Sequence, residues 1–372
     1  MSKRILITGG AGFIGSHVAD ELLEHGYKVR ALDVLLPQVH GAERKTPSYL
    51  NPEIELLVGD VRDPNVVRKA LAKVDAVFHF AARVGVGQSM YEIEKYTSAN
   101  NAGTAVLIEA LMEFPVERLI VASSMSIYGE GLYETADGRE GVPVERTAEQ
   151  LRRGDWEVRN GNHEALNPVP TPEEKTPSLA SIYALSKYHQ ERMCLIFGGA
   201  YGIPAVALRF FNVFGSRQSL SNPYTGVLAI FASRILNGNR PLIYEDGRQQ
   251  RDFVSVHDVS RACRLALERP EAAGRVFNIG SGRPRTILSI AEKMTELLGK
   301  PRIKPQITRK YRVGDIRHCF SDITLARKIL EYDPRVPFEE GLVELTSWLE
   351  EQKPDDRFTE ANAQLTARRL TL

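Results

Sequence analysis

The chain has 372 residues, of which 43% are hydrophobic and 26% are charged, as in ordinary soluble globular proteins. This composition excludes collagen-like, coiled-coil and intrinsically disordered chains, and the length favours one large α/β unit or two lobes that share a cleft. The 48 basic and 47 acidic residues leave a formal net charge of +1. That charge is too small to hold a nucleic acid by counterion release alone, so no nucleic-acid partner is expected.

The first two thirds of the chain alternate short apolar runs with amphipathic stretches. Runs typical of buried strands lie at 5–8, 27–33, 54–58, 76–80, 118–123 and 205–210. Stretches with the i, i+3, i+4 spacing of amphipathic helices lie between them, at 15–24, 66–71, 93–113 and 183–197. Because strict alternation indicates βαβ crossovers, we expect an α/β fold built on a Rossmann-type, doubly wound parallel sheet.

The pattern changes near residue 217. Short strands are expected at 241–244 and 276–279, and helices at 259–268, 289–298, 324–330 and 340–350. We therefore expect a first domain over 1–216, a smaller α+β lobe over 217–350 and a polar tail over 351–372. A return of the chain from the second lobe to the first domain is left open. A stretch rich in Gly, Glu, Arg and Pro, at about 130–177, is predicted to be a surface insertion in the first domain.

The cysteines and the apolar segments bear on location. Cys194, Cys263 and Cys319 lack the spacing of a disulfide framework or a zinc site, so no metal is expected. The apolar run near the N-terminus is too short for a signal peptide, and no run reaches the ~18 apolar residues of a membrane span. We expect a cytoplasmic protein without a membrane partner.

Three glycines open the first predicted helix. Gly9, Gly12 and Gly15 follow the first strand in a G-x-x-G-x-x-G spacing, which lets the backbone approach a pyrophosphate held at the helix N-terminus. Asp33 ends the second strand, where its carboxylate can accept both hydroxyls of an adenosine ribose and repel a 2′-phosphate. The motif predicts a dinucleotide cofactor and favours NAD over NADP. An ordinary glycine-rich turn is the alternative interpretation.

Further candidates follow later strands, at the edge where open α/β sheets bind their ligands. Asp60 and Val61 follow the third strand, where they can meet an adenine. Phe80, Ala81 and Ala82 end the fourth, and the small alanines would let a dinucleotide cross the sheet edge. Gly-Asp turns and Ala-Ala packing pairs are common, so only their position singles these residues out.

Tyr183 and Lys187 are four positions apart on a predicted helix and therefore share a face. A tyrosine has a reference pKa of about 10, and a neighbouring ammonium stabilises its phenolate so that it can act as a base nearer neutral pH. Ser123 and Ser124 close the fifth strand. A surface Tyr/Lys pair without a function fits the same spacing.

Together these motifs resemble those of the extended short-chain dehydrogenase/reductases, specifically the NAD-dependent nucleotide-sugar epimerases and dehydratases. The resemblance covers about residues 3–350 and includes the segments 96–104, 208–215, 246–259, 278–282 and 312–315. It implies NAD as cofactor and a nucleotide sugar as substrate. The implied cofactor contacts are Gly9, Gly12, Phe13, Ile14, Gly15, Asp33, Asp60, Val61, Phe80, Ala81, Ala82, Asn100, Ser123, Tyr183, Lys187 and Phe210.

The resemblance also implies the catalytic roles. Ser124 would hydrogen-bond the sugar hydroxyl being oxidised, Tyr183 would take its proton, and Lys187 would tune Tyr183 and hold the nicotinamide ribose. Arg251 and Arg312 would clamp the diphosphate, although each is also compatible with an ordinary surface cation. Asp315 would orient Arg312 or the nucleoside ribose. The implied substrate contacts are Ser124, Ser126, Asn212, Val227, Tyr244, Arg251, Arg312 and Asp315.

The family's dimer implies an interface through the helices at 93–113 and 183–197, whose apolar positions are equally compatible with a monomer core. The insertion at 130–177 is longer than in compact relatives. Both its ends are anchored between the strand of Ser124 and the helix of Tyr183, so it is expected to be a lid or a selectivity element. An inert surface loop is the alternative.

Met125 and Ser126 narrow the choice among the reactions that the family catalyses. Related dehydratases carry an Asp-Glu pair directly after the strand-end hydroxyl residue, but Met125 and Ser126 stand there, and neither is an acid or base at neutral pH. The sequence therefore favours C4 epimerisation with retained NAD, and the resemblance favours a dTDP-6-deoxyhexose such as dTDP-L-rhamnose. A dehydratase, a reductase and a UDP-hexose 4-epimerase are the alternatives. A non-catalytic NAD-binding regulator is more remote, because it has no need of a tuned phenol.

Overall fold

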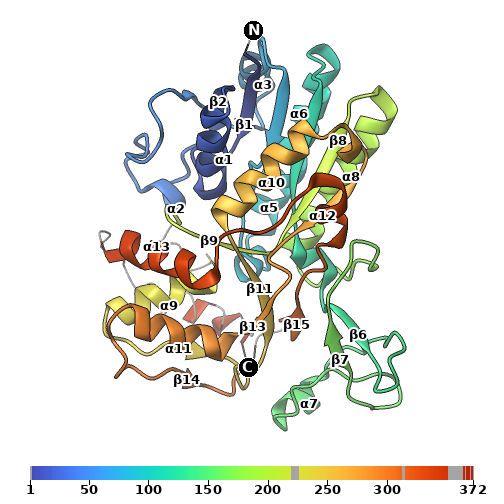
Figure 1. The fold of residues 1–372 in the computed structure, drawn as a ribbon, viewed down its shortest axis with the longest axis vertical. Helices are drawn as coiled ribbons and strands as arrows, with labels where there is room; N and C mark the ends of the chain where they lie inside the picture. Colours follow the sequence, from blue (N-terminus) through green and yellow to red (C-terminus); the bar gives the residue numbers. More distant parts are fainter. Residues whose placement is uncertain are drawn as a thin grey trace.

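The computed structural model describes residues 2–218, 226–311, 315–350, 363–364, 366–368 and 370–371. Arg312 and most of the expected tail over 351–372 lie outside the described residues. A seven-stranded sheet forms the centre of the molecule (Figure 1). Its paired strands all run parallel, and their order is β3-β2-β1-β4-β5-β8-β12. Its strands are β1 (Arg4–Thr8), β2 (Lys28–Asp33), β3 (Glu55–Val58), β4 (Ala76–His79), β5 (Arg118–Ser124), β8 (Ala205–Phe210) and β12 (Val276–Ile279). The order reverses between β1 and β4, which confirms the predicted Rossmann-type class.

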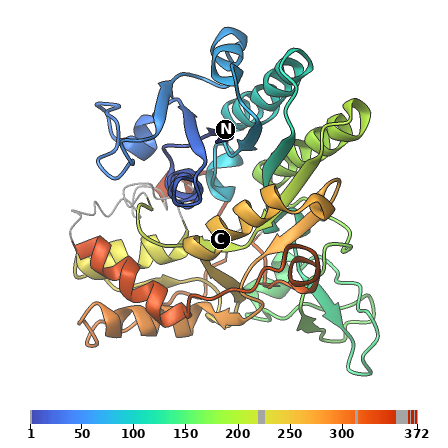
Figure 2. The same ribbon diagram turned by 45° about the horizontal axis from the view of Figure 1, so that its top comes forward.

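Alternation along β1 explains the two layers of helices, which Figure 2 shows from a second angle. Ile5 and Ile7 belong to one core, beneath α1 (Phe13–Glu24), α10 (Val256–Glu268) and α12 (Thr324–Leu330). Leu6 belongs to the other, beneath α3 (Pro64–Leu71), α6 (Gly103–Glu113) and α8 (Ile182–Tyr201). The strands are buried on both faces, as parallel strands require.

The chain returns to the first domain after the second lobe has begun. The strand at 276–279, which the sequence pattern placed in the second lobe, is β12, and it pairs in parallel with β8. Helix α10, also placed in that lobe, packs against α1. The physical reason is that Phe277 and Ile279 are fully buried, which a position in the large two-sided sheet provides. Periodicity identified the strand but not the sheet that it joins.

The second lobe has its own apolar core, with Phe231, Met294 and Leu342 at its centre. This core is formed mainly by α9 (Val227–Leu236), α11 (Ile287–Leu297) and α13 (Phe338–Glu350). A four-stranded sheet contains β9 (Asn212–Phe214), β11 (Gln250–Ser255), β13 (Pro284–Thr286) and β15 (His318–Cys319), and β10 (Leu242–Ile243) pairs with β14 (Gln306–Ile307). Because β9 directly follows β8 in the chain, the β9–β11 pair ties this lobe to the edge of the central sheet.

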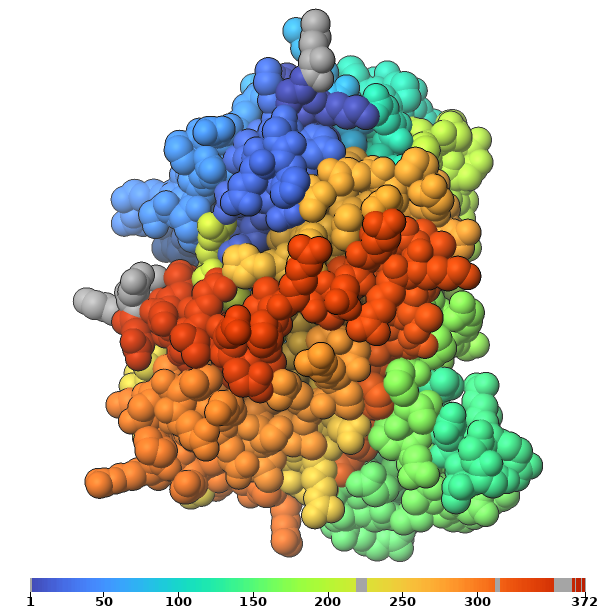
Figure 3. Space-filling view, viewed as in Figure 1, coloured from blue at the N-terminus to red at the C-terminus, as the bar shows by residue number. Residues whose placement is uncertain are grey.

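The insertion at 130–177 is a folded unit with a small core of its own. Its strands β6 (Leu132–Glu134) and β7 (Asn167–Val169) pair antiparallel, and α7 (Ala148–Arg152) lies between them in the chain. Tyr133, Val158 and Leu166 form the buried cluster. Figure 3 shows the insertion, in green, as a knob beside the second lobe.

The helix predicted over 93–113 is divided into three parts. It consists of α5 (Ile93–Tyr96), a π-helical segment (Thr97–Ala102) and α6. π-Helical turns are rare and often mark functional regions. This one buries Asn100, whose Oδ1 accepts a hydrogen bond from the Arg83 main chain at 2.7 Å. In the described part of the chain, no helix combines the length and apolar character that crossing a bilayer requires.

Candidate active site

The carboxyl ends of six sheet strands line one cavity of about 690 Å³, which continues into the second lobe. It lies at the point where the strand order reverses, the usual ligand position in such sheets. The predicted cofactor contacts that line it are Gly9, Gly12, Phe13, Ile14, Gly15, Asp33, Asp60, Val61, Phe80, Ala81, Ala82, Ser123, Tyr183, Lys187 and Phe210. The predicted substrate contacts that line it are Ser124, Ser126, Asn212 and Val227. The structure therefore brings these two sets together.

The glycine loop forms a cradle of bare backbone. A Cβ on Gly9, whose φ is +74°, would lie 2.9 Å from the Ala81 nitrogen, and a Cβ on Gly15 would lie 2.3 Å from the Gly9 oxygen. A Cβ on Gly12 would meet only the Gly9 oxygen, at 3.3 Å. The space beside Gly12 is therefore open toward the cavity, and the N-terminus of α1 stands behind it. These residues fit the pyrophosphate of a dinucleotide.

Asp33 is fixed at the end of β2 by main-chain donors. Its Oδ2 accepts a hydrogen bond from the Ala11 nitrogen at 3.1 Å, and its Oδ1 accepts one from the Leu35 nitrogen at 2.9 Å. His40 also lines the cavity, with its Nε2 3.8 Å from Asp33 Oδ1. Burial lowers the pKa of His40, and the Asp33 charge opposes that shift. Sequence reasoning missed His40, because no motif marks the short helix α2 (Pro37–His40) that follows β2.

Two buried polar atoms at the cavity wall are unpaired. Asn212 Oδ1 and Gln218 Oε1 have no hydrogen-bond partner among the described residues, and both side chains belong to the lining. Buried polar groups almost always have a partner. These two atoms are therefore suited to contact a bound ligand.

The catalytic candidates meet where β5 ends and α8 begins. Ser181 caps α8, because its Oγ accepts a hydrogen bond from the Ala184 nitrogen at 3.1 Å. The Tyr183 nitrogen donates to Oγ of Ser89, the last residue of α4 (Val86–Ser89), at 3.0 Å. Burial raises the pKa of the Tyr183 phenol, and a hydrogen bond with the Ser124 side chain lowers it. Ser124, Tyr183 and Lys187 all line the cavity.

Lys187 is held by a buried chain of polar side chains. Its Nζ donates to Gln190 Oε1 at 2.8 Å, and Gln190 Nε2 donates to Thr104 Oγ1 at 2.9 Å. His79 hydrogen-bonds Thr104 at 2.8 Å and, on its other side, Thr8 at the same distance. Burial lowers the pKa of Lys187 to about 8.

His79 is neutral within this row of hydrogen-bonded side chains, because burial and then the charge of Lys187 lower its pKa to about 3. Sequence reasoning stopped at the Tyr-x-x-x-Lys pair and missed Gln190. Gln190 could have been found from its position, because it is a polar residue three positions after Lys187 on the same helix face.

A buried ion pair lies behind the two serines. The Ser123 hydroxyl donates to Glu191 Oε2 at 2.6 Å, and Arg209 contacts Glu191 Oε1 at 2.7 Å. Both charged side chains are almost fully buried. The Ser123 hydroxyl is therefore engaged with Glu191.

Four predicted site residues do not line the cavity. Asn100 supports the backbone of Arg83, which does line it together with Arg62. The Arg251 guanidinium donates to the main-chain oxygens of Gln250 at 2.8 Å and Arg317 at 3.0 Å, and to that of Ile316. The two others are Tyr244, whose main-chain oxygen accepts from Gln249, and Asp315, whose main-chain oxygen accepts from Arg146.

Residues 5–280 match the model of the NAD dependent epimerase/dehydratase family. The chain belongs to this family, and NAD is its cofactor. A dTDP-L-rhamnose 4-epimerase from Burkholderia thailandensis is 34% identical to it, over 94% of this chain and 96% of the relative.

Two solved structures match the fold, each with a TM-score of 0.77 over 94% of this chain and 99% of theirs. One is a UDP-glucose 4-epimerase with UDP-glucose from Thermotoga maritima, at 31% identity. The other is a UDP-glucuronic acid 4-epimerase from Bacillus cereus in complex with UDP-glucuronic acid and NAD, at 26% identity. The chain is thus an NAD-dependent enzyme of the epimerase class, an isomerase.

Proposed function

We propose that the enzyme inverts C4 of a nucleotide-activated hexose. The observation that carries this proposal is that Ser124, Tyr183 and Lys187 lie together at the wall of the cavity. Ser124 orients the C4 hydroxyl, and Tyr183 takes its proton as the carbonyl forms and returns it afterwards. NAD, when bound, supplies a reversible hydride acceptor. Lys187, fixed by Gln190, holds the nicotinamide ribose.

The surroundings of Ser124 favour epimerisation over dehydration. Dehydration across C5 and C6 needs a further acid and base, whereas Met125 and Ser126 are the next residues of the wall. Met125 belongs to a buried apolar cluster with Tyr128 and Phe211. Among the described lining residues, the only carboxylates are Asp33, at the end of β2, and Asp60, just after β3. One base therefore serves the sugar.

The substrate proposed is a dTDP-6-deoxyhexose, with dTDP-L-rhamnose as the first candidate. The Burkholderia relative supports this choice by its name. The apolar Met125, next to Ser124, suits a C6 methyl group better than a hydroxymethyl group. A UDP-hexose is the second candidate, favoured by the name of the Thermotoga structure. The nucleoside diphosphate is proposed to bind in the second lobe, at Tyr244, Arg251, Arg312 and Asp315.

The proposal extends to assembly and location. Leu185 and Ile196 on α8 are 50% and 62% exposed, and Met112 on the adjacent α6 is 49% exposed. Such apolar exposure on neighbouring helices supports a homodimer formed through them. All three cysteines are free and buried, as suits a reducing compartment, and we infer a cytoplasmic enzyme.

The test is a panel of dTDP-, UDP- and GDP-hexoses, incubated with the NAD-loaded enzyme and resolved by NMR. We expect dTDP-L-rhamnose to be converted to its C4 epimer with the highest kcat/KM of the panel. The Tyr183→Phe enzyme is the control for contaminating activity. A stable 4-keto-6-deoxy product would contradict the proposal.

A further inference from the structure

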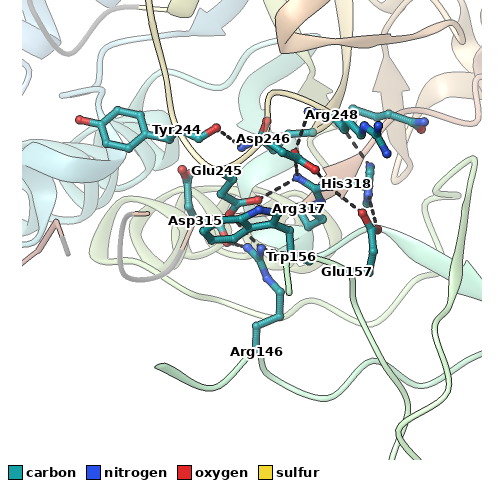
Figure 4. Close-up of polar contacts among 12 residues, drawn as sticks. Arg146, Trp156, Glu157, Tyr244, Glu245, Asp246, Arg248, Asp315, Arg317 and His318 are labelled. Atoms are coloured by element: carbon teal, nitrogen blue, oxygen red, sulfur yellow. Dashed lines mark hydrogen bonds and ion pairs between the residues drawn. The ribbon is translucent and has the colours of Figure 1, made fainter. Parts of the chain in front are cut away.

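A partly buried cluster of charged side chains joins the insertion to the second lobe (Figure 4). At its centre the fully buried Arg317 donates to Glu245 Oε2 at 2.9 Å, to the two oxygens of Asp246 at 2.6 and 2.9 Å, and to Glu157 Oε1 at 2.7 Å. Glu157 belongs to the insertion, whereas Glu245 and Asp246 follow β10. These four residues and Arg146 are called the interlobe cluster below.

Arg146 is the second member that the insertion supplies. Its guanidinium donates to Glu245 Oε1 at 2.8 Å, and to the main-chain oxygens of Trp156 at 3.2 Å and Asp315 at 2.9 Å. The Glu245 side chain is 1% exposed, so its carboxylate lies between two arginines from different parts of the fold. Glu245 also has a φ of +52°, which costs energy for a residue with a side chain. The loop at 244–246 therefore depends on these two ion pairs.

The insertion also contacts the second lobe on either side of residues 312–314. Glu130 accepts hydrogen bonds from the Arg317 nitrogen at 2.8 Å and the His318 nitrogen at 3.1 Å. Trp156 and Leu151 of the insertion form a buried apolar cluster with Tyr311 of the second lobe. The main chain on either side of 312–314 is thus fixed from the side of the insertion.

These contacts surround the proposed nucleotide-binding residues. Tyr244 directly precedes Glu245, Asp315 carries the oxygen to which Arg146 donates, and Arg251 is held by the main chain of Ile316 and Arg317. No described residue of 130–177 is among those that line the cavity. The contacts therefore differ from those of a lid that closes directly on the ligand. They are the contacts of a support for the segments that carry the proposed nucleotide-binding residues.

We propose that Arg146 is a positioning residue for the nucleotide end of the substrate, and that it acts through Glu245 and the main chain of Asp315. This proposal rests on the proposed function, because it takes the second lobe to bind the nucleoside diphosphate. Arg146 makes no contact with Ser124, Tyr183 or Lys187 among the contacts of the described residues. Its loss should therefore weaken substrate binding and leave the chemical step intact.

The experiment compares Arg146→Met, which removes the charge and keeps much of the volume, with Arg159→Met as the matched control. Arg159 belongs to the same insertion, but it pairs with Asp155 at 3.1 Å and donates to the His163 oxygen without reaching the lobe. For the NAD-loaded enzymes we would measure kcat and KM with dTDP-L-rhamnose. Calorimetry would give the Kd of dTDP and UDP, and the NAD content and melting temperature would be recorded.

Arg146→Met should raise KM and the nucleotide Kd by about tenfold or more, with kcat within about twofold and an unchanged NAD content. Arg146→Lys should recover part of the affinity, because an ammonium can reach Glu245 but lacks the fork that also reaches Asp315. Arg159→Met should match the wild type. Wild-type Kd and KM in a folded Arg146→Met enzyme, or a loss confined to kcat, would overturn the proposal.

Glu157→Gln decides the matter if Arg146→Met does not fold. It removes one charge of the cluster from a half-exposed side chain, and a smaller rise in Kd and KM is expected. A wild-type Kd in that variant would then overturn the proposal. The two proposals fail separately. Nucleotide binding that weakens in Arg146→Met without any sugar turnover rejects the proposed function alone, whereas turnover with unchanged affinity rejects the positioning role alone.

Discussion

Two alanine substitutions in the glycine loop should separate cofactor binding from folding. In Gly12→Ala the new methyl group meets only the Gly9 oxygen, at 3.3 Å, and the φ of −75° and ψ of 177° suit alanine. We expect a change of less than about 1 kcal/mol in the free energy of unfolding of the NAD-free protein. The methyl group nevertheless occupies space beside the cavity that a pyrophosphate would approach. A steric penalty of about 1–3 kcal/mol corresponds to a loss of NAD affinity of about fivefold to 150-fold.

Gly15→Ala should behave differently, because its Cβ would lie 2.3 Å from the Gly9 oxygen and 2.8 Å from the Gly10 Cα. The backbone must shift, which costs about 1–3 kcal/mol of stability even without NAD. The assays are thermal unfolding of the NAD-free proteins and quantification of the nucleotide released on denaturation. Wild-type NAD affinity in Gly12→Ala would refute the placement of the pyrophosphate, and wild-type stability in Gly15→Ala would refute the steric reasoning.

Three further predictions concern the cavity. In NAD-free protein the Lys187 contribution to the free energy of unfolding should rise by about 3 kcal/mol between pH 8 and 10.5, since the unfolded chain binds that proton more tightly. Denaturant titrations of Lys187→Met should lack this rise. Identical pH profiles of stability in the wild type and Lys187→Met would contradict the lowered pKa of Lys187. Tyr183→Phe should lower kcat at least about a hundredfold while NAD stays bound. A Tyr183→Phe enzyme that kept a tenth of the wild-type rate would show that another group is the base. The wild type should release NAD and not NADP on denaturation, and Asp33→Ser should shift the ratio of their affinities toward NADP by about tenfold or more.

Local sequence patterns predicted the fold and the cofactor half of the site. The glycine loop and the Tyr183/Lys187 pair are encoded within a few residues each, so spacing was enough to find them. The apolar runs gave the central strands to within a residue or so at most ends, because parallel strands are buried on both faces. The sequence pattern left open which sheet β12 joins, because burial by distant elements decides it.

The remaining features depend on residues far apart in the chain. Gln190 is 111 positions from His79, and Arg317 is 160 positions from Glu157, yet each pair is in contact. No sequence window contains both partners, so neither the support of Lys187 nor the interlobe cluster could be found from a single sequence. The same limit applies to Ser124 and Tyr183, which are 59 positions apart and line the same cavity.

The epimerase mechanism is tested most directly by following hydrogen at the sugar ring. dTDP-L-rhamnose carrying deuterium at C4 would be incubated with the NAD-loaded enzyme in ordinary water, and the unlabelled sugar would be incubated in D₂O. One base and one returning hydride predict a C4 epimer that keeps its C4 deuterium and takes up no solvent deuterium at C3 or C5. Loss of the C4 label, or solvent deuterium at C3 or C5, would contradict this mechanism.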